Sequence, residues 1–218
     1  MKRVFPLFLI LLLFAASCTP SYLAPYAAIE PQKGPLSFEE HLKLGTIYEQ
    51  KGMLKSAVEE YKKAAELNST SARPYFGMGN IHLALKRYGE AEADFRKAID
   101  IDSTQGVYYN NLGWVYMETG RLIEAQTMVT RGLTLDIQNQ YIYLDTLGLI
   151  ETRFNNYEGA ENLLKRAAAD IPVTDIRGLI HIYTHLYELY LISGKTRQAE
   201  ETRKKLDDLT KGIAPLLP

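Results

Sequence analysis

The chain has 218 residues, of which 46% are hydrophobic and 23% are charged, proportions that are typical of folded proteins. Its formal net charge is −1, and its one basic block, Arg203-Lys204-Lys205, lies beside acidic residues, so we interpret that block as a solvated helix face. A nucleic-acid partner is not expected, because neutralising phosphate requires a basic face. Cys18 is the only cysteine, which excludes a disulfide within the chain.

Residues 1–17 have the form of a secretory signal peptide, with a positive start, an apolar run and small residues before Cys18. The apolar run is shorter than the roughly 20 residues that a spanning helix needs. The small residues before the cysteine resemble a bacterial lipobox, although Ala15 stands where leucine is usual. This resemblance implies cleavage before Cys18 and a diacylglycerol on its sulfur. Ordinary secretion is the alternative, in which general signal peptidase would recognise Ala15 and Ser17.

A lipidated Cys18 would carry two or three acyl chains, which anchor a protein firmly. The next residue is Thr19, not the aspartate that resembles an inner-membrane retention signal. The resemblance therefore implies an outer-membrane lipid anchor facing the periplasm. The alternative is a soluble periplasmic adaptor without the anchor.

Residues 18–37 are predicted to be a tether, because four prolines interrupt any helical pattern there. As a flexible coil, a spacer of this length would span about 24 Å. Such a tether would hold the folded part clear of the lipid surface.

Residues 38–213 contain a repeat with a period of 34 or 35 residues. Glycines at 45, 79, 113 and 148 each follow Leu or Met, and an alanine lies twelve residues after each glycine. The unit resembles the tetratricopeptide repeat, a pair of antiparallel helices with small residues where the helices touch. This implies an all-α, right-handed α-solenoid. Four clear units cover 38–71, 72–105, 106–139 and 141–174, and a degenerate unit with Tyr187 at the glycine position covers 180–213, before a tail at 214–218.

Two features of the residues support the same helix pairs. Turn signals break the expected helices at Lys51-Gly52, Lys86-Arg87, Thr119-Gly120, Asn155-Asn156 and Ser193-Gly194. One hairpin cannot bury its apolar face alone, so the pairs must stack on one another. Before the last pair, Thr174 or Asp175 could cap a longer helix that runs to Ile192.

In the tetratricopeptide family the first helices of the pairs line a concave groove that receives a peptide or a helix. The resemblance places these residues on the groove: Phe76, Asn80, Leu83, Asn110, Asn111, Trp114, Met117, Asp145 and Leu149. Asn111 matches the asparagine that contacts the ligand backbone in peptide-clamping members. Arg73 alone falls at a basic groove position of the central repeats, so a carboxylate clamp is not expected. The groove instead suits an extended segment or an amphipathic helix.

Other interpretations of these residues remain open. Trp114 could pack in the core between repeats, and the asparagines could face solvent or join neighbouring helices by hydrogen bonds. His181, His185 and Glu188 fall on one helix face and could present ligands to zinc. Because His181 is followed by isoleucine and not by the glutamate of the zinc-protease motif, we interpret them as helix-surface residues.

We therefore expect a non-enzyme with no metal, no cofactor and no small-molecule substrate. The resemblance implies a membrane-anchored scaffold or adaptor that binds a protein or peptide partner. Related lipoproteins assist assembly of pili or secretion pores, or dock cell-wall machinery, and the sequence favours none of these over the others.

Overall fold

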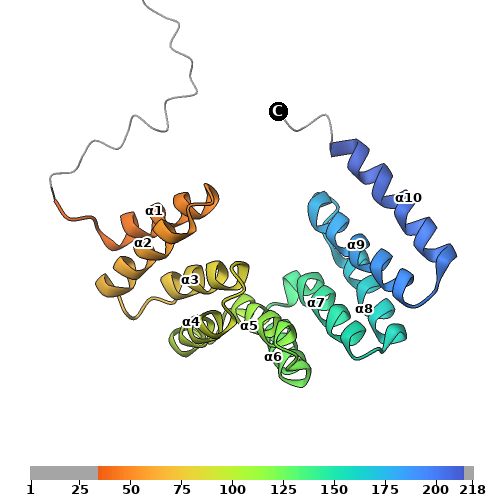
Figure 1. Cartoon of the computed structure of the whole chain (residues 1–218), viewed down its shortest axis with the longest axis horizontal. Coiled ribbons are helices and arrows are strands. Elements are labelled where there is room, and N and C mark those ends of the chain that lie inside the picture. The colour runs from red at the N-terminus through yellow and green to blue at the C-terminus, as the bar shows by residue number, and fades with distance from the viewer. Residues whose placement is uncertain (1–33, 214–218) are drawn as a thin grey trace, which may run out of the picture. The chain divides into compact units, whose positions relative to one another are not determined.

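The structure is a computed structural model that describes residues 34–213, and Figure 1 labels its helices. The expected signal peptide, Cys18, residues 18–33 of the tether and the tail at 214–218 lie outside the described residues. In the described part no helix is both long enough and apolar enough to cross a bilayer.

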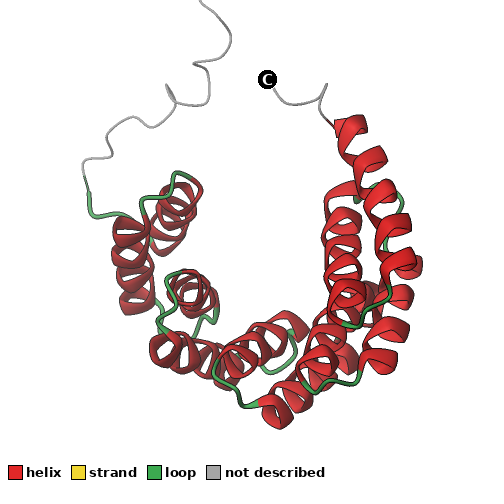
Figure 2. Ribbon diagram, turned by 45° about the vertical axis from the view of Figure 1, so that its right-hand side comes forward, coloured by secondary structure: helices red, strands yellow, loops and turns green. Residues whose placement is uncertain are grey.

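Residues 37–213 fold as ten α-helices and one short 3-10 helix, with no strand among the described residues. The elements are α1 (Phe38–Gln50), α2 (Leu54–Leu67), α3 (Arg73–Ala84), α4 (Tyr88–Ile101), α5 (Gly106–Glu118), α6 (Leu122–Leu135), η1 (Ile137–Asn139), α7 (Gln140–Arg153), α8 (Tyr157–Asp170), α9 (Ile176–Ile192) and α10 (Thr196–Ile213). Consecutive helices pack as hairpins joined by short loops (Figure 2). The first helices α1, α3, α5, α7 and α9 also contact one another in sequence. The predicted all-α solenoid is confirmed.

The turn inside each hairpin has the geometry that its sequence predicts. Gly52, Gly120 and Gly194 take left-handed backbone angles, with φ of 71°, 78° and 72°. Lys86 and Asn155 occupy the equivalent places with φ of 57° and 61°. In all five turns a backbone N–H just past the left-handed residue donates to a carbonyl five residues back, at 2.8 or 2.9 Å. This pattern satisfies carbonyl groups that the end of a helix would otherwise leave unpaired.

The two helices of each clear repeat touch through one glycine and one large side chain. Tyr61 lies on Gly45, Phe95 on Gly79, Val129 on Gly113 and Leu164 on Gly148. A Cβ added at any of these glycines would lie only 2.4 to 2.7 Å from that side chain. The large side chains are almost entirely buried, so each glycine lets its hairpin close around them.

The last hairpin begins earlier than the predicted fifth unit. α9 starts at Ile176, not at residue 180, because the Asp175 side chain caps it by accepting a hydrogen bond from the Gly178 N–H at 2.9 Å. The helix then runs to Ile192, as the predicted cap implies.

Candidate functional site

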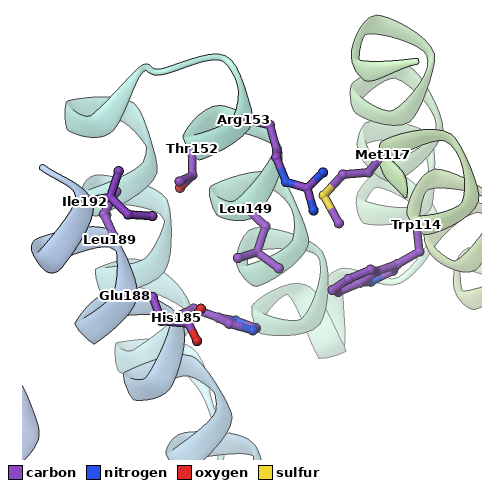
Figure 3. Close-up of a pocket in the computed structure, with 9 residues that line it drawn as sticks. All are labelled: Trp114, Met117, Leu149, Thr152, Arg153, His185, Glu188, Leu189 and Ile192. Carbon is purple, nitrogen blue, oxygen red and sulfur yellow. The ribbon is translucent and has the colours of Figure 1, made fainter. Parts of the chain in front are cut away.

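A hollow of about 270 Å³ lies between α5, α7 and α9, the first helices of the last three hairpins. Its lining residues are Trp114, Met117, Leu149, Thr152, Arg153, His185, Glu188, Leu189 and Ile192. In Figure 3 these side chains come from three separate helices and converge on one space. The lining is mostly apolar, and its polar members lie on α7 and α9.

Three of the predicted groove residues line this hollow: Trp114, Met117 and Leu149. Trp114 and Leu149 are partly buried and pack against the central core cluster. Met117 is only 1% exposed, so it forms the inner wall of the hollow. Trp114 thus packs on the core with part of its surface while another part faces the hollow.

The predicted asparagines form a short polar row across α3 and α5. The Asn111 side-chain amide donates to the Asn80 side-chain oxygen at 2.8 Å, so these two residues join neighbouring helices. Asn110 is 4% exposed, and its side-chain oxygen has no hydrogen-bond partner within the described residues. A buried acceptor without a partner costs about 1–3 kcal/mol, so this oxygen is a local cost to stability and is too deeply buried to be reached by a bound partner.

The remaining predicted groove residues have partners of their own. Phe76 packs between Tyr108 and Phe95, with ring centroids 4.9 and 6.0 Å away. Leu83 packs against the central core cluster. Asp145 is buried, and one of its carboxylate oxygens lies 2.8 Å from Nδ1 of His185. Little of the Asn110, Met117 and Asp145 side chains is therefore open to a partner.

Ion pairs connect successive first helices beside these residues. Arg73 pairs with Glu39 at 2.8 Å, so the one basic residue predicted on the central groove already has a carboxylate. Arg153, on the edge of the hollow, pairs with Glu118 at 2.9 Å. These pairs are exposed, and each contributes little stability. Of the two pairs, only Arg153–Glu118 places charge at the edge of the hollow, because Arg73 and Glu39 lie on α3 and α1.

The sequence-based site missed six lining residues of the hollow. Thr152 stands 35 residues after Met117, and Arg153 stands 35 after Glu118, so the repeat register alone could have located both. The four residues on α9 were missed because the degenerate fifth repeat lacks the glycine that sets the register.

Comparisons with known proteins agree with the fold. Residues 45–86 match a family model described as TPR repeat, and residues 72–105 and 107–139 each match a tetratricopeptide repeat model. A search of curated proteins gave no significant match.

Several solved structures have a similar fold. The pilF protein of Pseudomonas aeruginosa is 18% identical with a TM-score of 0.68, over 78% of this chain and 75% of that chain. PilW, described as a widely conserved type IV pilus biogenesis factor, is 19% identical with a TM-score of 0.71, over 80% and 78%. YrrB, described as a TPR protein with an unusual peptide-binding site, is 21% identical with a TM-score of 0.56, over 78% and 84%. At these identities the similarity shows the fold alone.

Proposed function

The chain is a tetratricopeptide-repeat protein, and we propose that it is a membrane-anchored scaffold that binds a protein partner with the hollow between α5, α7 and α9. The observation that carries this proposal is the hollow itself, where an aromatic and several aliphatic side chains from three first helices surround one space. Its volume of about 270 Å³ is just below the range of typical small-molecule pockets but accommodates a large side chain.

The chemistry of the lining specifies the kind of partner. Trp114 and Leu149 offer a partly buried apolar surface, and Ile192, which is 61% exposed, extends it. Arg153 and Glu188 place charges of both signs at the same hollow. This combination favours an extended segment or an amphipathic helix that inserts one large apolar residue and pairs its polar flanks with the rim.

The membrane anchor is a separate part of the proposal. Cys18 directly follows an apolar run and three small residues, which supports lipidation of its sulfur and attachment to an outer membrane facing the periplasm. We further propose that the scaffold assists an envelope complex, such as a pilus, a secretion pore or cell-wall machinery. The shared fold of the pilus biogenesis factor PilW supports this choice.

A crosslinked pull-down from intact cells tests the hollow. The natural chain should recover a partner, and Trp114→Ala should recover at least about tenfold less, because truncating a central aromatic anchor commonly costs 2 kcal/mol or more. The matched control is Ile123→Ala, which removes an aliphatic side chain that is 73% exposed on the second helix α6. Recovery from this control should equal that of the natural chain.

Folding must be checked in the same experiment. Trp114→Ala should keep its helical content and its cooperative unfolding, since Trp114 is only partly buried. Where it does not, Thr152→Arg gives the same test by filling the hollow from a partly buried position. Equal recovery from the natural chain and a folded hollow variant would refute binding at this site.

A further inference from the structure

Asp145, His181 and His185 form a compact cluster between α7 and α9. One potential ligand atom from each side chain lies within 4.8 Å of the other two. Nδ1 of His185 lies 2.8 Å from an oxygen of Asp145, and the two imidazole rings meet edge to face with centroids 4.4 Å apart. Asp145 and His185 stand 40 residues apart in the sequence, so the solenoid fold brings them together.

This cluster differs from the two other buried histidine–carboxylate pairs. His41 lies 2.6 Å from Glu60, and His82 lies 2.7 Å from Asp94, each inside its own hairpin. Each of those pairs has a single imidazole, and a hydrogen bond between helices accounts for it. In the α7–α9 cluster a second imidazole joins the pair, and a hydrogen bond between Asp145 and His185 does not explain the place of His181.

The dimensions and ligand types fit a transition-metal ion. In a tetrahedral site with Zn–N and Zn–O distances of about 2.0–2.2 Å, neighbouring ligand atoms are about 3.3–3.6 Å apart. The observed cluster needs Asp145 and His185 to separate slightly and the exposed His181 to rotate inward. Imidazole and carboxylate are ligands that Zn²⁺ accepts, and the exposed side of His181 provides an entry path.

We propose that Asp145, His181 and His185 bind one Zn²⁺ ion that ties α7 to α9 beside the hollow. Three protein ligands leave one coordination position for water or for a side chain of a bound protein. The sequence alone did not identify this site, because only the two histidines share a helix and the carboxylate comes from the preceding repeat. The proposal does not depend on partner binding in the hollow.

Zinc titration of the purified full-length chain against a chromophoric chelator tests the site. The natural chain should bind one Zn²⁺, and His181→Asn should lower the affinity at least about 100-fold, the upper end of the loss seen for residues that only support a ligand. His181 is exposed, so this variant should fold like the natural chain in the absence of zinc. Glu188→Gln is the matched control, since it removes a carboxylate on the same helix face but outside the cluster, and it should bind like the natural chain.

Cobalt binding distinguishes metal coordination by Asp145, His181 and His185 from a purely structural role of these side chains. Co²⁺ bound to the natural chain should show visible absorption bands of four-coordinate geometry, and these bands should be absent from His181→Asn and Asp145→Asn. The proposal is overturned if the natural chain binds no stoichiometric zinc. It is equally overturned if folded His181→Asn binds zinc as tightly as the natural chain.

Discussion

Gly132 shows how one residue departs from the repeat for a local reason. The other clear repeats carry Ala64, Ala98 or Ala167 at this place. In α6 an alanine Cβ would lie 2.7 Å from the backbone oxygen of Gly106 and 2.7 Å from the ring of Tyr143. Because backbone atoms and a tyrosine of the next repeat fill this space, the third repeat requires glycine.

We predict that Gly132→Ala lowers the free energy of unfolding, because overpacking a filled core alone costs about 1–3 kcal/mol. This loss should exceed the helix propensity of about 1 kcal/mol that alanine gains over glycine. Denaturant unfolding measures the change. Gly89→Ala in α4 is the matched control, because a Cβ there meets nothing within 4 Å. If both variants have the same free energy of unfolding, the close packing around Gly132 does not affect stability.

Individual residues show which parts of the hollow the sequence predicts and which parts it does not. Trp114 and Leu149 follow from the register of the repeat and do line the hollow. The partner of Asp145 does not follow from the register, because His185 lies in a repeat whose glycine is replaced by Tyr187. A periodic pattern predicts which face a residue occupies, whereas the pairing of polar side chains depends on how two neighbouring repeats meet.

At the scale of elements, the sequence predicts where helices end better than it predicts the segments that connect one repeat to the next. Asp175 caps α9 as expected, and the five turns occur where Gly, Asn or Lys-Arg interrupts the pattern. The spacing of 35 between Gly113 and Gly148 indicated an extra residue but not its place. In the structure α7 has eight residues before its glycine where α5 has seven, and η1 precedes α7.

Glu161 in α8 makes the polar contacts that join the fourth hairpin to the fifth. Burial alone would raise the pKa of its carboxyl from the ordinary value of 4.5. Hydrogen bonds from Lys165, Lys195 and Tyr190 outweigh burial and lower this pKa to about 2. Tyr190 lies in α9 and Lys195 follows it, so the ionised carboxylate connects the two hairpins.

A carboxyl group with a lowered pKa in the folded state stabilises the protein above its unfolded pKa, and this contribution disappears as the pH falls from about 4.5 to about 2. We predict that Glu161→Gln removes about 1–2 kcal/mol of stability at pH 7, less than the full shift implies because both lysines are partly exposed. The difference from the natural chain should shrink towards pH 2.

Denaturant unfolding at a series of pH values measures this effect. The control is Glu158→Gln, an exposed acidic residue in the first turn of the same helix, which should differ little from the natural chain. A constant difference between Glu161→Gln and the natural chain from pH 7 to pH 2 would contradict the role of the ionised carboxylate.

At the scale of the whole molecule, the proposed membrane anchor requires a lipid on Cys18. Phase separation of a detergent extract should place the natural chain in the detergent phase, because two or three acyl chains bind it firmly. Cys18→Ser should move the protein to the aqueous phase, and Thr19→Ser should not. A natural chain found in the aqueous phase would favour the soluble periplasmic adaptor.

The stacking of hairpins produces the hollow that we propose as the binding site. Each hairpin contacts mainly its neighbours in the stack. The successive first helices α5, α7 and α9 therefore contribute side chains to one continuous surface. The core behind the hollow is closely packed, with Met117 and Leu189 almost fully buried. The shape of the hollow is therefore held by the same contacts that hold the repeats together.

The most direct test of this account is photocrosslinking in intact cells from a reactive amino acid placed at position 152, inside the hollow. We predict a discrete adduct with one partner protein, which disappears when Trp114→Ala is added. The same amino acid at position 123, on α6, should give no such adduct. An adduct from position 123 alone, or an adduct from position 152 that is unchanged by a folded Trp114→Ala variant, would contradict binding in the hollow.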